Sequence, residues 1–238
     1  RSSVGVLTEQ HGLYLRMTAV EYLDFFGKVY NLDASARKQR SDYLLEYFGL
    51  AKAAQRRIGE YSKGMRQKLA LARTLIHEPP VLLLDEPTSA MDPESARLVR
   101  DEIANLRSSQ RAIVICTHNL VEAEALADEI AIIYQGKILV KDQLPALKRD
   151  VLGLPEYEIL FSKPWDVGSF AFPAGVDVVE KGECILSFRS VAPEETNPVI
   201  LAGLLKNNAP LLTLQEKSRS LEQVYLKVMA DVQGQGGL

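Results

Sequence analysis

The feature that most constrains the fold is an apolar run that ends in two adjacent carboxylates, Val81-Leu-Leu-Leu-Asp85-Glu86-Pro87. A continuous apolar run of this length is typical of a strand in a parallel sheet that is buried on both faces. Ala112–Cys116 is a second such run, and a segment with a helical repeat of apolar residues separates the two. Because parallel sheets place their ligands at the carboxyl ends of the strands, we expect Asp85 and Glu86 to lie at a binding site.

Strands alternate with helices over residues 1–143, and this order predicts an α/β fold with a mainly parallel sheet. Polar capping residues mark several helix starts, including a capping box formed by Thr18 and Glu21. The region from about residue 18 to 62 is predicted to form a small helical subdomain. Three predicted helices begin after Thr18, after Ser62 (ending near His77) and after Asp92, and two more cover residues 34–48 and 120–127. The predicted strands are Val4–Leu7, Val81–Leu84 and Ala112–Cys116. A hairpin is predicted over residues 129–140, with its turn at Gln135-Gly136.

The composition changes after about Leu144. Short strand-like segments alternate there with helical ones, and we expect a separate small α+β accessory domain over residues 144–238. Its predicted strands cover residues 157–161, 176–179, 185–188 and 211–214, and its predicted helices cover residues 198–206 and 221–229.

Composition and charge exclude several functional classes. The chain has 238 residues, a net charge of −3 and a pI of about 5.8, so there is no basic field for nucleic acid and we expect no such partner. Its apolar runs are shorter than the roughly 18 residues of a membrane-spanning helix, so a membrane role requires a partner. Cys116 and Cys184 lie in apolar runs and are expected to be buried thiols, and the scattered histidines make a zinc site improbable.

A further polar segment precedes the helix that begins near residue 63, with the sequence Tyr61-Ser62-Lys63-Gly64-Met65-Arg66-Gln67. A serine and a glycine at a helix N-terminus offer a hydroxyl group, backbone N–H groups and the positive end of the helix dipole, which together bind phosphate. The lysine adds positive charge. A serine cap without any ligand is the alternative, and this segment alone favours that alternative.

Two more segments lie close to the carboxylate pair. Ser89-Ala-Met-Asp92 directly follows it in sequence, and Cys116-Thr-His118 ends the next predicted strand. An isolated histidine is often only a surface residue. At the end of an adjacent parallel strand, however, His118 is placed to reach the same ligand as Asp85 and Glu86.

In this order and spacing, the segments together resemble one family, the ATP-binding subunits of ABC transporters. Tyr61–Met65 is similar to the signature loop of the family, Val81–Pro87 to the Walker B strand, Ser89–Asp92 to the D-loop and His118 to the switch histidine. The resemblance extends over Val4–Asp142. It implies a sheet like that of P-loop nucleotide hydrolases, with an ABC ATPase domain over residues 1–143.

The resemblance also implies roles for single residues. Asp85 would act through Mg²⁺, Glu86 would be the general base, and His118 would contact the γ-phosphate of ATP. In the family the signature loop closes on ATP held by the opposite subunit, which implies a head-to-tail pair of nucleotide-binding domains. The residues that would contact this ATP from the signature loop and the D-loop are Ser62, Lys63, Gly64, Met65 and Asp92.

Val4–Tyr14 resembles the Q-loop region of the family. The register places Glu9 at the position of the family's glutamine and Gln10 one residue later. Either side chain could approach Mg²⁺ or water, and we favour Glu9 as the second metal ligand.

Two features narrow the subfamily. The signature Ser62-Lys-Gly-Met-Arg-Gln is a familiar variant among exporters of the ABC-2 type, and Ser220-Leu-Glu-Gln-Val-Tyr-Leu226 is similar to an ending common in exporters of the multidrug, daunorubicin-resistance or sodium-efflux kind. A generic amphipathic helix capped by Ser220 is the alternative for the second. The resemblance implies a membrane-spanning permease partner that docks on residues 18–49, and a cytoplasmic location on the inner face of the membrane.

The chain departs from the family in one important respect: Gly-x-x-x-x-Gly-Lys-[Ser/Thr], the Walker A loop, does not occur in it. A strand, loop and helix of that kind need roughly 30 residues, and eight residues precede Glu9. We therefore expect the loop to lie upstream or to be absent, the sheet of this chain to expose apolar surface, and the chain by itself to be inactive. The alternatives are a non-hydrolysing interaction protein and a soluble ABC ATPase of repair or translation, although neither tandem cassettes nor a coiled-coil insertion is visible.

Overall fold

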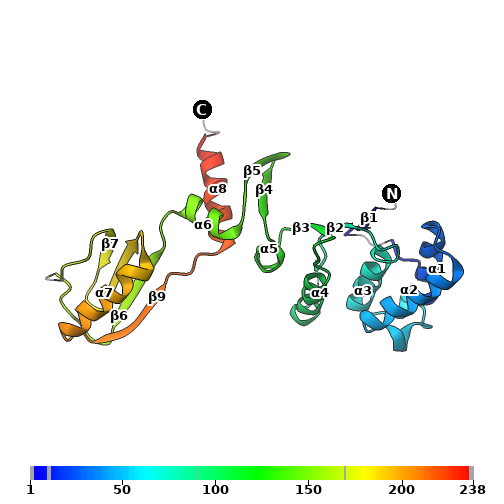
Figure 1. Cartoon of the computed structure of the whole chain (residues 1–238), viewed down its shortest axis with the longest axis horizontal. Helices are drawn as coiled ribbons and strands as arrows, with labels where there is room; N and C mark the ends of the chain where they lie inside the picture. Colours follow the sequence, from blue (N-terminus) through cyan, green and yellow to red (C-terminus); the bar gives the residue numbers. More distant parts are fainter. Residues whose placement is uncertain (1–2, 10–11, 90, 169, 236–238) are drawn as a thin grey trace. The chain divides into compact units, whose positions relative to one another are not determined.

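The computed structural model describes residues 3–9, 12–89, 91–168 and 170–235. The contacts divide the chain into two compact units, Arg1–Leu126 and Ala127–Leu238, whose elements Figure 1 shows in chain order. The expected accessory domain begins later, at residue 144, and that domain boundary stays a prediction. In the described part of the chain, no helix is both long and apolar enough to cross a membrane.

The first unit is built on a parallel sheet of three strands in the order β1 (Val4–Leu7), β2 (Val81–Asp85) and β3 (Ala112–Cys116). This confirms the predicted α/β fold with a parallel sheet. Its helices are α1 (Ala19–Val29), α2 (Ala34–Tyr47), α3 (Lys63–Thr74), α4 (Pro93–Asn105) and α5 (Leu120–Leu126), with short 3₁₀ turns at Ala51–Ala53 and Ile58–Glu60.

The helix starts follow from local sequence. Thr18 and Glu21 form the predicted capping box, in which Thr18 Oγ1 accepts from the Glu21 amide and Glu21 Oε2 accepts from the Thr18 amide. Gly49, at φ +66°, follows the end of α2 as predicted. Helix α3 ends at Thr74 rather than near His77, and Glu78, which precedes Pro79, has the left-handed φ of +52°. Because a residue before proline is disfavoured in the helical region, the helix cannot continue through Glu78.

The sheet is covered on one face. Leu7, Leu82 and Leu84 are buried there against the core that α1, α3 and α4 share, and Figure 1 shows α3 and α4 on this side of the strands. On the opposite face, Val6, Leu83 and Val114 lie in register and are 44%, 40% and 51% exposed. We call this opposite side the uncovered face.

The uncovered face corrects one expectation and confirms another. The expectation that β2 and β3 are buried on both faces is wrong for the described residues, whereas the expected apolar surface is present. The two cysteines also differ from expectation, because both are exposed. Cys116 ends β3 at the carboxyl edge of the sheet, and Cys184 lies in the turn before β8.

The second unit contains a hairpin, a sheet and a pair of helices. Strands β4 (Ile130–Tyr134) and β5 (Lys137–Asp142) form the predicted hairpin, and both turn residues, Gln135 and Gly136, have positive φ as a two-residue hairpin turn requires. The antiparallel sheet has the order β7-β8-β6-β9, formed by β6 (Glu156–Phe161), β7 (Val176–Lys181), β8 (Ile185–Ser190) and β9 (Leu211–Glu216).

Helix α7 (Pro193–Lys206) packs on this sheet through Ile200 and Leu204, while α6 (Leu144–Leu152) and α8 (Leu221–Gln235) contact each other. The sequence predicts the start of α7 near Pro198, but Pro193 occupies its first turn and Pro198 lies inside the helix. Helix α6, which begins directly after the hairpin, was not predicted.

Candidate functional site

The parallel sheet brings the predicted carboxylates and the histidine to one edge. Leu7 pairs with Leu84 and Asp85 pairs with Cys116, so the three strands end side by side. Glu9, the Asp85–Glu86 pair and His118 therefore all follow the carboxyl ends of neighbouring strands. Asp85 lies two residues after Leu83 on β2, so both side chains lie on the uncovered face.

Glu86 is the most firmly held of these side chains. Its Oε1 accepts a hydrogen bond from the backbone amide of His118 at 2.8 Å and lies 2.8 Å from the ring Nδ1, which donates when it carries the proton. The Glu86 side chain is 18% exposed and that of His118 is 82% exposed. The carboxylate is thus anchored to the end of β3, while the imidazole remains open to solvent.

The backbone reinforces this position. Glu86 has φ +48°, a left-handed conformation that is uncommon for a residue other than glycine. Its amide donates to the carbonyl of Cys116 at 2.9 Å. On the other side, Asn119 Oδ1 accepts from the amides of Val121 and Glu122 at the start of α5, which holds the segment that follows His118.

The residues expected to hold Mg²⁺ provide oxygen ligands only. Asp85 and Glu9 are both exposed, at the ends of adjacent strands; the alternative Gln10 lies outside the described residues. Among the described residues, no group of three or more acidic, histidine or cysteine side chains could hold a metal ion. Mg²⁺ in nucleotide sites is commonly bound through one or two carboxylates together with phosphate and water oxygens. This donor set therefore fits a Mg²⁺ ion that arrives with a nucleotide.

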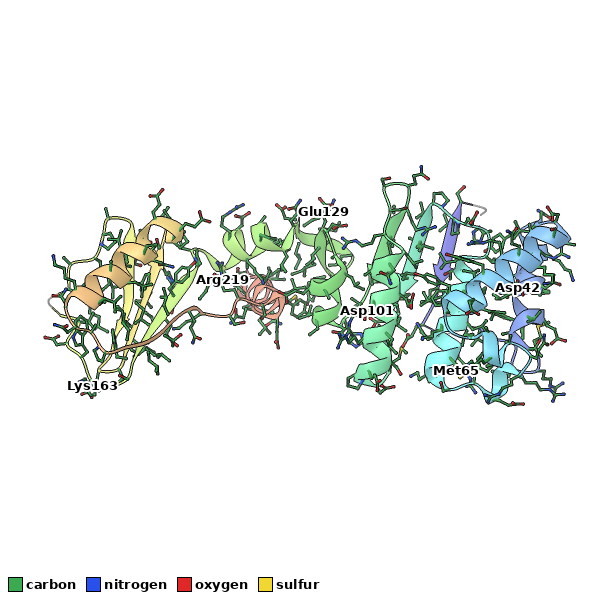
Figure 2. All side chains as sticks on the ribbon, turned by 60° about the horizontal axis from the view of Figure 1, so that its bottom comes forward. Asp42, Met65, Asp101, Glu129, Lys163 and Arg219 are labelled. Atoms are coloured by element: carbon green, nitrogen blue, oxygen red, sulfur yellow. The ribbon has the colours of Figure 1, made fainter. Side chains whose placement is uncertain are left out.

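The signature loop, Tyr61–Met65, leads into α3. Ser62 caps the helix, with its Oγ accepting from the Met65 amide at 3.2 Å. Ser62 and Lys63 are exposed, whereas the Met65 side chain, labelled in Figure 2, packs against the core. Within the loop, the side chains that are exposed to solvent are therefore those of Ser62 and Lys63.

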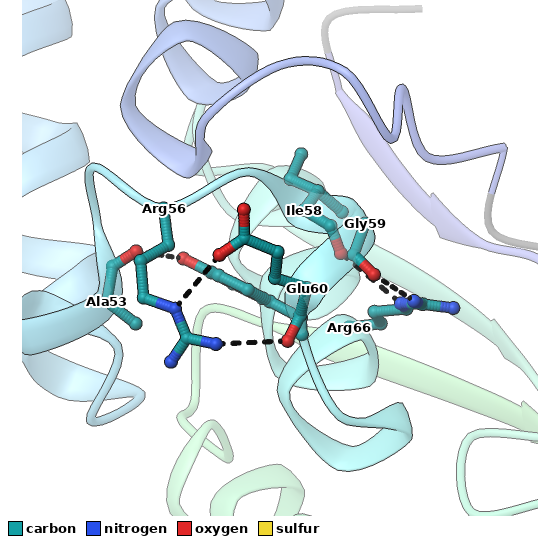
Figure 3. A network of polar contacts seen from close by, with 7 residues as sticks. Ala53, Arg56, Ile58, Gly59, Glu60 and Arg66 are labelled. Carbon is teal, nitrogen blue, oxygen red and sulfur yellow. Dashed lines mark hydrogen bonds and ion pairs between the residues drawn. The ribbon is translucent and has the colours of Figure 1, made fainter.

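Figure 3 shows how the segment before the signature loop is held. The Arg66 guanidinium, from α3, donates to the carbonyls of Ile58 at 3.3 Å and Gly59 at 2.8 Å. Arg56 contacts both the side chain and the carbonyl of Glu60. The buried Tyr61 hydroxyl donates to the carbonyl of Ala53 at 2.7 Å. Each contact ties the loop to the helical region rather than leaving it free.

The D-loop segment lies against the same helix. A Cβ atom added to Gly64 would lie 3.4 Å from Ser95 Oγ and 3.6 Å from Met91 Cε, which is van der Waals contact, so the loop passes close to the start of α4. Asp92 caps α4 by accepting from the Ser95 amide at 2.9 Å. Hydrogen bonds from the Ser95 side chain and amide lower the pKa of the exposed Asp92 carboxyl. Residue 90 lies outside the described residues.

One residue that was not predicted from the sequence joins these parts. Gln67, in α3, donates from Nε2 to the carbonyl oxygen of Pro87, directly after the Asp85–Glu86 pair. A signal was present in the sequence, because Ala70, Leu71 and Thr74 follow Gln67 at helical spacing and are all buried. A glutamine on the same helix face as these buried residues indicates a buried hydrogen bond.

Comparison with known proteins identifies the family to which the chain is similar. A family model described as "ABC transporter" matches residues 1–89. The chain is 40% identical to the ABC transporter ATP-binding protein NatA of Bacillus subtilis over 148 residues, which are 62% of this chain and 60% of NatA. It is 33% identical to the uncharacterized ABC transporter ATP-binding protein YxlF of the same organism, over 96% of this chain and 77% of that protein.

The Nod factor export ATP-binding protein I of Rhizobium sp. strain N33 is 32% identical, over 96% of this chain and 73% of that protein. A solved structure of an ATP-binding subunit of an ABC transporter matches with a TM-score of 0.57 and 26% identity. The match covers 64% of each chain. The chain thus spans less than two thirds of the length of NatA and of this solved chain. It spans more than two thirds of the length of YxlF and of the Nod factor export protein.

Proposed function

The chain belongs to the ATP-binding proteins of ABC transporters, and from this premise we propose that it hydrolyses ATP to power a membrane exporter of the ABC-2 type. The observation that carries the proposal is the placement of Glu86, anchored by His118 beside Asp85 at the carboxyl edge of a parallel sheet. Relatives named for export of Nod factors and of fluoroquinolones support the direction of transport.

Each residue at this edge has a proposed task. Asp85 and Glu9 would hold Mg²⁺ through their carboxylate oxygens. When bound, Mg²⁺-ATP supplies the phosphoryl group and the positive charge that offsets negative charge on it. Glu86 orients the attacking water and takes its proton onto the carboxylate. His118 keeps one Glu86 oxygen in place through its amide and its ring Nδ1, and the other ring nitrogen, Nε2, would contact the γ-phosphate.

The signature loop is proposed to work on a second nucleotide-binding domain. The exposed Ser62 and Lys63 offer a hydroxyl and an ammonium group at the positive end of α3, which suits a phosphate. Gly64 keeps the loop close to α4, and Met65 can contribute only through its backbone because its side chain faces the core. Asp92 would lie at the same junction. This arrangement requires a head-to-tail dimer.

The partner and the location follow from the same proposal. The helical region over residues 18–49 would dock a membrane-spanning permease, which would hold the protein at the cytoplasmic face of the membrane. Residues 144–238 would form an accessory domain. The identity of the exported substrate would be determined by the permease.

The test uses the full-length protein. Wild type should hydrolyse ATP in a Mg²⁺-dependent manner, and Asp85→Asn should abolish that turnover. Asp101→Asn is a matched control, because it makes the same chemical change at an exposed side chain in the second half of α4. Absence of hydrolysis by the wild-type protein would overturn the proposal and favour a non-hydrolysing interaction protein. Full activity of Asp85→Asn would overturn the proposed role of Asp85 in holding Mg²⁺.

A further inference from the structure

Gln67 links the helix that carries the signature loop to the turn that presents Glu86. Its side chain is 3% exposed, and its Nε2 donates to the Pro87 carbonyl at 2.5 Å. Burying an amide without a hydrogen bond is unfavourable, because its lost contacts with water are not replaced. A leucine or methionine would fill this space without that cost, so packing alone does not account for a glutamine here. The bond to Pro87 does.

The turn that receives this bond is strained. A left-handed conformation such as that of Glu86, with φ +48°, persists only where the surroundings determine it. The Glu86 amide is held by β3 through Cys116, and its carbonyl accepts from the Ser89 amide at 3.1 Å. Gln67 adds a hydrogen bond from the helix-covered side of the sheet, to the carbonyl of the residue directly after Glu86.

Helix α3 is continuous from Lys63 to Thr74, so the signature loop at its start and Gln67 in its second turn belong to one rigid element. A shift of the loop is therefore passed through the helix to the Pro87 carbonyl. At an active site, a displacement of about 1 Å can cost roughly 10²-fold in rate. The turn at Glu86 is thus placed to respond to the position of the signature loop.

We propose that Gln67 is a positioning residue: by holding the Pro87 carbonyl, it sets the orientation of the Glu86 carboxylate and ties it to the position of the signature loop in the same chain. Gln67 itself touches no reacting atom. The inference rests on the proposed role of Glu86 as the general base.

The experiment is a double-mutant cycle in the full-length protein. Gln67→Leu removes the donor at similar volume, and Gln67→Met is a second variant in case the first fails to fold. Thr74→Val is the matched control: Thr74 is also buried on α3, but its hydroxyl donates within the helix, to the Leu71 carbonyl. Steady-state ATP hydrolysis and ATP affinity are measured for each variant, alone and combined with Glu86→Gln.

Gln67→Leu should lower kcat by about 10-fold to 10²-fold, with KM and ATP affinity changed less than about twofold, and Thr74→Val should leave kcat within about twofold. In the Glu86→Gln background, Gln67→Leu should have almost no further effect, because both changes act through one group. An equal fold-loss in both backgrounds, or an unchanged kcat in the Gln67 variants, would overturn the inference. If Glu86→Gln alone leaves hydrolysis intact, the proposed role of Glu86 itself has failed, whatever the Gln67 variants do.

Discussion

The finding that helices cover only one face of the sheet can be tested by replacing two adjacent leucines on β2. Leu84 points into the core and is 1% exposed, whereas Leu83 lies on the uncovered face and is 40% exposed. Replacing each by alanine makes the same chemical change at neighbouring positions of one strand. The comparison therefore isolates the effect of the face.

The expected costs differ because only Leu84 leaves a cavity. Leu84→Ala in a closed core should lower the free energy of unfolding by about 2–5 kcal/mol. Full burial of a leucine is worth about 1.5–3 kcal/mol. Leu83 is 40% exposed and therefore gains little more than half of this burial free energy. Because its removal leaves no enclosed cavity, Leu83→Ala should lower the free energy of unfolding by about 1 kcal/mol.

The assay is urea unfolding of the 238-residue chain at low micromolar concentration, followed by far-UV circular dichroism. Leu84→Ala should lower the midpoint clearly more than Leu83→Ala does. Leu83→Lys should in addition reduce aggregation, because it places a charge in an exposed apolar stripe. Equal destabilisation by the two alanine variants would refute the reading that this face is uncovered.

Two further predictions concern the 238-residue chain by itself and its second unit. The 238-residue chain should show no binding of Mg²⁺-ATP by calorimetry, since it contains no Walker A loop; micromolar affinity would contradict this. Hydrogen bonds from Lys217 and Arg189 lower the pKa of the Glu156 carboxyl in the folded state. The stability that this carboxylate contributes is therefore fully present above its unfolded pKa of about 4.3. It is lost as the pH falls through the lower folded pKa. Glu156→Gln should therefore flatten the acid dependence of unfolding below about pH 4.5, and an unchanged pH profile would count against the ion pairs.

Local features of the fold were predictable from the sequence. Thr18, Asp92 and Gln135-Gly136 determine a helix start or a turn through bonds to their immediate neighbours, so their effect does not depend on the rest of the chain. The start of α7 was misplaced because a proline at a helix start and a proline inside a helix look alike in sequence, and Pro193 and Pro198 both occur there.

The site was predictable to the extent that topology determines it. Parallel strands that end together bring Asp85, Glu86 and His118 to one edge, and the structure places them there. The bond from Gln67 to Pro87 joins residues of different elements and depends on how α3 packs, which periodicity does not specify. The exposure of Cys116 likewise depends on what covers the sheet, and the strand's own sequence carries no information about that.

The central claim is that Glu86 is the group that activates water. Its most direct test is the paired measurement of ATP affinity and single-turnover hydrolysis in the full-length Glu86→Gln protein. We predict that ATP affinity is retained while the hydrolysis rate falls by at least about 10²-fold, the usual size of a general-base contribution. Hydrolysis at the wild-type rate in this variant would contradict the claim.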